Sequence, residues 1–179
     1  YKQSYELVER KNEGIKISVN GKEYEYFNGF YSHTGMADKT LSFNSLVFAG
    51  YGINGMKHNE VKNFNFKEKA VFILDGLPKK MEESGWEQKM EKKISFFEKE
   101  KAAALFIVSE DFKVYKNSLG KYTNHSKMML AKEYKEIQIP VFVISKEMFE
   151  EIFSGQLKLK KEKKSVEKNP SKYPNEKKG

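Results

Sequence analysis

Residues 47–53 read Val47-Phe48-Ala49-Gly50-Tyr51-Gly52-Ile53, an apolar run that ends on closely spaced glycines. Extended to Gly55, it carries the spacing G-x-G-x-x-G, which is typical of dinucleotide-binding loops. The same glycines are also expected where a backbone bends sharply and packs closely at the end of a strand. The stretch therefore predicts either a nucleotide-binding domain that uses Gly50, Gly52 and Gly55 or a buried strand that ends in a tight turn.

The residues that follow the glycines favour the tight turn. A dinucleotide site needs a helix that begins at the third glycine, because the amides of its first turn bind the pyrophosphate. Residues 56–69 offer only Val61 and Phe64 as a spaced apolar pair, among several asparagines. Asp75 ends the next apolar run at a distance suited to a ribose-binding acid, so nucleotide binding stays open as the weaker alternative.

Composition predicts one globular core. The chain has 179 residues, of which 39% are hydrophobic and 14% aromatic, and this is too apolar for a disordered protein. No apolar run approaches the roughly 20 residues that a membrane-spanning helix needs. Cysteine is absent, which excludes disulfides, thiolate nucleophiles and Cys-ligated zinc. Because the chain begins at Tyr1 without methionine, we expect a processed or trimmed piece of a longer protein.

The positive charge is concentrated near the C-terminus. Residues 158–179 hold nine lysines and three glutamates, a local net charge of +6 out of +8 for the whole chain. Arg10 is the only arginine, and bidentate recognition of guanine or phosphate favours arginine over lysine. The pattern predicts a solvated tail with weak polyanion contacts at most, and no specific nucleic-acid site.

Alternation and apolar runs predict the strands. Residues 15–19 and 22–27 alternate apolar with polar side chains on either side of Asn20-Gly21, which indicates a β-hairpin with a two-residue turn. Residues 28–40 carry turn-forming residues and little periodicity, so we expect a loop. Four apolar runs indicate buried strands, at residues 46–50, 70–74, 102–108 and 139–144.

One long helix is predicted between the second and third apolar runs. Ser84 and Glu87 form an S-x-x-E capping box, in which each side chain satisfies a backbone N–H at the start of a helix. Apolar residues then follow at spacings of four, four and three along one helical face: Trp86, Met90, Ile94 and Phe97. As the first member of this face, Trp86 is expected in the core, with a place on an interaction surface as the alternative.

The remaining chain is less regular. A short helix is expected at residues 128–133, and Ser145 is expected to cap another that ends near Gly155. Residues 157–159 alternate leucine with lysine and indicate an edge strand. Residues from 160 onward are expected to form a linker.

No catalytic or metal-binding motif is present in the sequence. His33, His58 and His125 are the only histidines, and none lies in a short ligand pair such as H-E-x-x-H. No G-x-S-x-G nucleophile motif occurs. We therefore predict no catalytic residue, no metal site and no cofactor in this chain.

In order and spacing, four blocks resemble the protease-associated (PA) domain that is inserted in secreted zinc aminopeptidases. They are SLVFAGYGI at 45–53, FKEKAVFILDGLP at 66–78, the helix of 86–100 with KAAALFIV at 101–108, and IPVFVIS at 139–145. The resemblance covers about residues 44 to 160. The family usually has glycine where Glu68 and Lys101 stand, so the geometry of those two turns is a point of departure.

The resemblance implies an α/β fold of the PA-type swivelling β/β/α class, with a small barrel-like or layered β core and flanking helices. Residues 1–43 would be an N-terminal β-hairpin extension, 44–160 the PA-like domain and 161–179 a Lys-rich linker or tail. The family's module is not catalytic. It covers a protease active site, helps to select substrates or contacts proteins, and the zinc ligands lie in a separate domain.

The implied function is that of a non-catalytic accessory module of a bacterial, extracytoplasmic metallopeptidase. Its partners would be a peptide or protein substrate, or the parent's catalytic domain. We expect the binding surface in the loops 52–59 and 75–83, because such loops commonly carry function. The expected contact residues are Tyr51, Asn54, His58, Asp75, Pro78 and Trp86. A self-contained zinc aminopeptidase fragment remains a second alternative.

Overall fold

The computed structural model describes residues 7–10, 16–19, 21–33, 42–43, 45–55, 59–82, 90–119, 127–130 and 139–178. The strands are β1 (Leu7–Arg10), β2 (Ile17–Val19), β3 (Lys22–Tyr24), β4 (Phe30–Ser32), β5 (Ser45–Phe48), β6 (Ala70–Leu74), β7 (Ala104–Ser109), β8 (Lys127–Leu130), β9 (Val141–Ser145) and β10 (Asn175–Lys178). The helices are α1 (Lys79–Glu82), α2 (Met90–Lys99), α3 (Phe112–Leu119), α4 (Lys146–Ile152) and α5 (Leu159–Lys168), with a 3-10 turn at Pro170–Lys172.

A six-stranded mixed sheet forms the centre of the molecule, in the order β10-β5-β6-β7-β9-β4. The four inner strands β5, β6, β7 and β9 are parallel to one another, whereas β10 and β4 pair antiparallel at the two edges. The class is therefore mixed α/β, as the sequence predicts. The sheet is open, so the layered form of the expected core describes it better than the barrel-like form.

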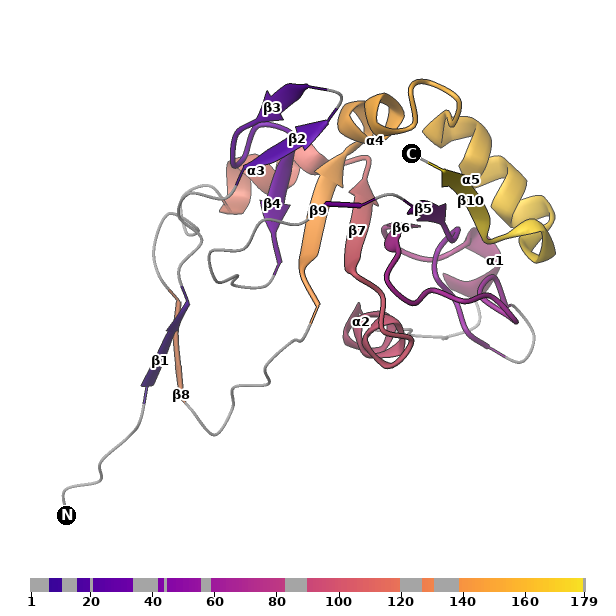
Figure 1. Ribbon diagram of the computed structural model, residues 1–179, viewed down its shortest axis with the longest axis horizontal. Helices are drawn as coiled ribbons and strands as arrows, with labels where there is room; N and C mark the ends of the chain where they lie inside the picture. Colours follow the sequence, from indigo (N-terminus) through magenta and orange to yellow (C-terminus); the bar gives the residue numbers. More distant parts are fainter. Residues whose placement is uncertain are drawn as a thin grey trace, which may run out of the picture.

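Helices cover both faces of the sheet (Figure 1). On β6, Phe72 and Leu74 belong to the apolar cluster that includes residues of α4 and α5, whereas Val71 and Ile73 belong to the cluster that includes residues of α2. All five residues of β6 are buried, which explains why a strand covered on both faces is a continuous apolar run in the sequence. A row of stacked aromatic rings crosses the sheet at Phe72, Phe106 and Phe142, with centroid distances of 4.6 and 5.2 Å.

Several predicted elements are confirmed. β2 and β3 form the expected hairpin, with Val19 opposite Lys22 across the turn. Ser145 caps α4, because its hydroxyl oxygen accepts a hydrogen bond from the amide of Met148 at 3.2 Å. The capping box at residues 84–87 lies outside the described residues, but the helix predicted with it is present as α2, with Ile94 and Phe97 buried.

Two predictions for irregular regions are wrong. Residues 28–40 include β4, an edge strand whose three residues are all buried against β9. Residues 127–130 form β8, which pairs with β1, instead of the start of a helix at 128–133. In both places the partner strand is more than a hundred residues away in the chain, and a local pattern contains no information about such pairing.

The C-terminal segment is not the expected linker. Residues 159–168 form α5 in place of an edge strand, and Leu159, Glu162 and Val166 are buried at helical spacing. The chain then returns as β10 to pair with β5. The sequence does not reveal this helix, because only three of its residues are buried and lysines occupy most of the other positions. None of the helices in the described part of the chain combines the length and apolarity needed to cross a membrane.

Candidate interaction site

The glycine turn after β5 brings the backbone into close contact with the core. Gly50 and Gly52 have φ angles of +58° and +68°, where glycine is favoured. A Cβ on Gly50 would lie 2.9 Å from the carboxyl carbon of Glu60, and one on Gly52 would lie 2.9 Å from Cγ2 of Ile73. Residues 59–69, the described part of the segment after Gly55, contain no helix. The turn therefore serves close packing, and the carboxylate of Glu60 places negative charge where a phosphate would have to approach.

Glu60 closes the loop that follows this turn. Its side chain is fully buried, and Oε2 accepts a hydrogen bond from the amide of Ile53 at 3.2 Å. Its own amide donates to the carbonyl oxygen of Ile53 at 2.9 Å. Asn59 adds a third link, donating from Nδ2 to Oδ1 of Asn54 at 3.0 Å. The loop is thus held at both ends by short-range hydrogen bonds.

Lys93 of α2 joins this loop to the one that follows β6. Its side chain is only 1% exposed, and Nζ donates a hydrogen bond to the carbonyl oxygen of Gly76 at 2.9 Å. Burial lowers the pKa of Lys93 to about 8, and the negative charges of Glu60 and Asp75 oppose this shift. A buried ammonium between two acidic groups couples the two loops electrostatically.

The C-terminal segment packs at the same end of the sheet. The hydroxyl of Tyr173 donates a hydrogen bond to Glu162 of α5 at 2.8 Å, and both side chains are buried. Burial raises the pKa of Tyr173 to about 12, and the charges of Glu162 and Glu60 act in the same direction. Val166 lies beside Gly50, since a Cβ on Gly50 would meet its Cγ1 at 3.1 Å. α5 therefore covers the glycine turn.

We call these four buried polar side chains, Glu60, Lys93, Glu162 and Tyr173, the carboxyl-edge cluster. Each is at most 9% exposed, so none can contact a peptide directly. The cluster lies at the end of the sheet where β5 and β6 finish, the edge at which open α/β sheets bind ligands. The cluster stabilises the loops above it, through the hydrogen bonds of Glu60 and Lys93. In these loops Asn54, Gly76 and Lys79 are exposed.

The six expected contact residues fall into different environments. Asn54 is exposed and Asp75 is half-buried, with Oδ1 of Asp75 accepting a hydrogen bond from the amide of Gly76 at 2.8 Å. The side chain of Tyr51 is only 2% exposed and lies in the core, so the expectation that it faces a partner is wrong. Pro78 is also buried. His58 and Trp86 lie outside the described residues.

The sequence did not single out any member of the carboxyl-edge cluster. Three of the four come from segments that gave no site signal, because the cluster is assembled from distant parts of the chain. Lys93 does carry a signal: it stands three residues after Met90 and four before Phe97, within the apolar face of α2. A lysine at such a position is a candidate for a buried amine with a partner.

The described residues were also compared with the requirements of a metal site. His33 is exposed, and the other two histidines lie outside the described residues. Within the described ranges, no group of three or more His, Asp or Glu side chains is arranged to hold a metal ion.

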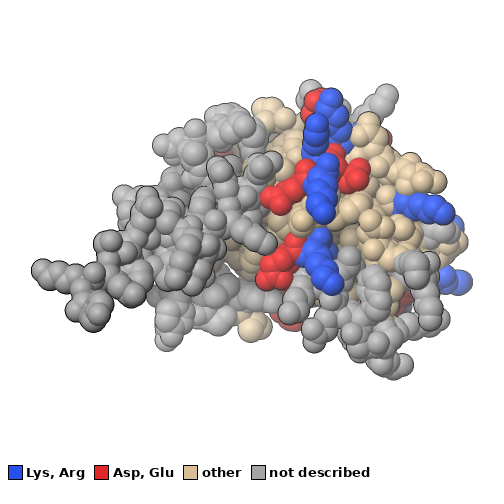
Figure 2. All heavy atoms as spheres, turned by 90° about the horizontal axis from the view of Figure 1, so that it is seen from below, with Lys and Arg blue, Asp and Glu red and all other residues tan. Residues whose placement is uncertain are grey.

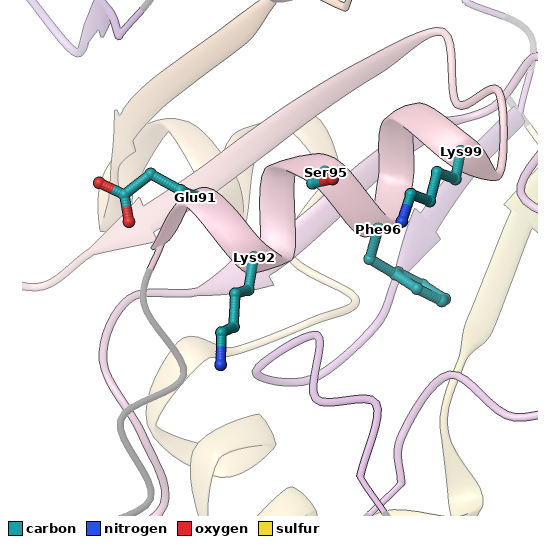
Figure 3. Close-up of a pocket in the computed structure, with 5 residues that line it drawn as sticks. All are labelled: Glu91, Lys92, Ser95, Phe96 and Lys99. Carbon is teal, nitrogen blue, oxygen red and sulfur yellow. The ribbon is translucent and has the colours of Figure 1, made fainter.

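A shallow hollow lies on the outer side of α2. It is lined by Glu91, Lys92, Ser95, Phe96 and Lys99 and has a volume of about 390 Å³. Figure 3 shows Lys92, Phe96 and Lys99 on the same side of the helix. Figure 2, seen from the side on which α2 lies, shows lysines intermixed with carboxylates. The described side chains of this face therefore carry both signs of charge.

Comparisons of the chain with protein-family models, with curated proteins and with solved structures gave no match.

Proposed function

We propose that the chain is a non-catalytic protease-associated module of an extracytoplasmic, zinc-dependent aminopeptidase. It presents the loops above the carboxyl-edge cluster to a peptide substrate or to the catalytic domain of the parent protein. The zinc and its ligands belong to that separate domain. The module contributes shape and position, not chemistry.

The observation that carries this proposal is the backbone geometry at the two positions where the sequence departs from the family. Glu68 and Lys101 replace the usual glycines, and they have φ angles of +60° and +56°. Both angles lie in the left-handed region, which glycine adopts without strain and other residues rarely adopt. The turns thus keep the geometry that glycine would favour, although the side chains differ.

The arrangement of the strands also supports the proposal. The four resembling blocks contain β5, β6, β7 and β9, which are neighbours in the sheet in the same order as in the sequence. The resemblance therefore covers one continuous structural unit. In this unit the two loops proposed to bind follow adjacent strands, so they emerge at the same edge.

A braced loop suits an interaction function. Ordering flexible side chains and loops costs free energy on binding, and a preformed surface reduces that cost. Here the loop of 53–60 is closed by Glu60, and the carbonyl of Gly76 is held by Lys93. Among the described residues of these loops, Asn54 and Lys79 are exposed and Asp75 is half-buried, so polar side chains are available to a partner.

The geometry favours this function over nucleotide binding. The first glycine of G-x-G-x-x-G is in contact distance of the buried carboxylate of Glu60, not of an open anion site. A dinucleotide would bring its pyrophosphate against that negative charge.

The purified 179-residue chain tests the proposal in three assays. We expect measurable binding of unstructured peptides by fluorescence anisotropy, no hydrolysis of aminoacyl substrates with or without added zinc, and no thermal shift with NAD or ATP. Substituting Asn54→Ala and Asp75→Asn together should weaken peptide binding. Zinc-dependent hydrolysis by the chain, or a nucleotide-induced shift, would replace the proposal with one of its alternatives.

A matched control comes from the opposite edge of the sheet. Asn65 accepts a hydrogen bond from the amide of Lys67 at 3.0 Å, much as Asp75 accepts one from Gly76. Asn65→Ala with Lys67→Ala should leave peptide binding unchanged. Equal loss in both double variants would show that the binding surface is not at the carboxyl edge.

A further inference from the structure

α5 carries a dense row of lysines on an ordered helix. Five exposed lysines form what we call the α5 lysine face: Lys160, Lys161, Lys164, Lys168 and Lys172. The helix is seated by Leu159 and Val166, which are fully buried. The positive charge near the C-terminus is therefore held in a fixed arrangement instead of being spread along a flexible tail.

Helix geometry gathers four of these lysines on one side. At about 100° per residue, Lys160, Lys164 and Lys168 follow one another at intervals of about 40°, and Lys161 completes an arc of about 100°. The buried positions 159, 162 and 166 occupy the opposite side of the same helix. Figure 1 shows α5 at the outer margin of the molecule, so this arc faces away from the sheet.

The acidic residues nearby do not neutralise the face. Glu162 is turned inward and accepts the hydrogen bond from Tyr173, and Glu167 is half-buried at the margin of the arc. Two other lysines of this segment do have carboxylate partners: Lys163 pairs with Glu110 at 2.6 Å and Lys158 with Glu150 at 3.1 Å. The five lysines of the face form no ion pair within the described part of the chain.

The composition of the face restricts the kind of anion that it fits. Lysine is a hydrated point charge and does not make the bidentate contacts with which arginine recognises individual phosphates. The described part of the segment exposes no aromatic ring on which a base could stack, unlike surfaces that bind single-stranded nucleic acid. Single-stranded nucleic acid is also usually held in a groove of the protein, whereas these lysines stand on a convex helix. A convex row of point charges fits a flat, negatively charged surface.

We propose that the α5 lysine face docks the protein on the surface of an anionic lipid bilayer. The lysines contact headgroup phosphates, and nothing inserts into the hydrocarbon, because the apolar side of α5 is already used in the core. Clusters of four to eight lysines on a helix are sufficient for this kind of adsorption. The docking uses other residues than the peptide-binding function, since none of the five lysines belongs to the loops of 52–59 and 75–83.

Vesicle co-sedimentation tests the proposal. The 179-residue chain is mixed with vesicles of phosphatidylcholine alone or with added phosphatidylglycerol. We expect binding only to the anionic vesicles, and release on raising the salt concentration because screening weakens the attraction. The triple variant Lys160→Gln, Lys164→Gln, Lys168→Gln should lower the partition coefficient by about a hundredfold, and Glu167→Lys, which changes the charge by two units, should raise it by about thirtyfold.

A control with the same change in net charge separates the face from the overall charge. Lys92→Gln, Lys99→Gln and Lys113→Gln remove three exposed helical lysines from elsewhere and should retain most of the binding. Near-ultraviolet circular dichroism checks that each variant is folded. Equal loss in both triple variants, absence of binding to either vesicle, or preference for double-stranded DNA or heparin over anionic vesicles would overturn the proposal.

Discussion

The amide of Glu68 donates a hydrogen bond to the carbonyl oxygen of Lys101 at 2.9 Å, and both residues have positive φ angles. This contact joins the turns that precede β6 and β7. These turns lie at the amino ends of the parallel strands, opposite the carboxyl-edge cluster. Two neighbouring residues with side chains thus occupy a conformation that favours glycine. The resembled family usually has glycine at these two positions. The backbone angles of Glu68 and Lys101 therefore bear on the resemblance more directly than any side-chain contact does.

Replacing either residue with glycine should stabilise the protein. Left-handed backbone costs a residue with a side chain roughly 1–2 kcal/mol, part of which glycine returns as extra entropy of the unfolded chain. We expect Glu68→Gly and Lys101→Gly each to raise the free energy of unfolding in urea by about 0.5–1 kcal/mol. Lys92→Gly, within α2, is the control and should lower it by about 1 kcal/mol. Destabilisation by all three changes would mean that the two turns do not have this geometry.

The glycine turn predicts a contrast between two alanine substitutions. Gly50→Ala forces a Cβ into contact with Glu60 at 2.9 Å, whereas a Cβ on Gly76 would meet nothing within 4 Å, and both glycines have positive φ. Gly76→Ala should therefore cost only the backbone strain, about 1 kcal/mol. Gly50→Ala should cost at least about 2–4 kcal/mol because overpacking is added. Chemical denaturation of both variants checks this, and equal costs would contradict the close contact.

The buried amine of Lys93 predicts a rise in stability at alkaline pH. Its pKa is about 8 in the folded protein and 10.5 as the ordinary value. Between these values the unfolded chain binds more protons than the folded one, so the free energy of unfolding rises with pH. The rise from this group is of the order of 3 kcal/mol at most. It should be seen as a growing difference between the wild type and Lys93→Met in urea titrations from pH 8 to pH 10.5.

The exposed neighbour of this amine provides the control. Lys92→Met removes a lysine from the outer side of α2, and its stability curve should run parallel to that of the wild type. If the curve of Lys93→Met also ran parallel, the amine of Lys93 would not be held in the way the structure shows.

One face of α5 packs in the core and the other is exposed. Shortening a side chain should therefore lower the free energy of unfolding on the first face and hardly change it on the second. Leu159 is fully buried, whereas Lys160 beside it is exposed. Leu159→Ala should lower the free energy of unfolding by about 2–5 kcal/mol. Lys160→Ala should change it by less than about 0.5 kcal/mol. If both substitutions were neutral by thermal and chemical denaturation, residues from 159 onward would behave as a linker.

The sequence was most informative where a segment is buried on both sides. β6 and β7 are continuous apolar runs because helices cover both faces of the sheet, and α4 could be located because Ser145 caps it. β10 shows the opposite case. It consists of Asn, Glu, Lys and Lys, and its place in the sheet depends on backbone pairing with β5 and on contacts of Glu176 with Lys69 and Ser45. No local pattern could have indicated that strand.

Only part of the candidate site can be predicted from the sequence, because only part of it depends on local features. The bend at Gly50 and the position of Asp75 at the end of a strand are local properties, and both could be inferred. Whether a side chain such as that of Tyr51 turns inward depends on the segments that pack over it. The pairing of Lys93 with the Gly76 carbonyl joins residues from separate elements, and it becomes visible only once α2 is placed against the sheet.

The most direct test of the interaction function is a nuclear magnetic resonance titration of the isotopically labelled chain with an unstructured peptide. We expect chemical-shift changes that cluster at Asn54, Asp75 and Gly76, with an intact peptide at the end of the titration. Changes confined to the opposite edge of the sheet, around Lys67 and Lys101, would contradict the interaction function. Cleavage of the peptide by the chain would contradict it as well.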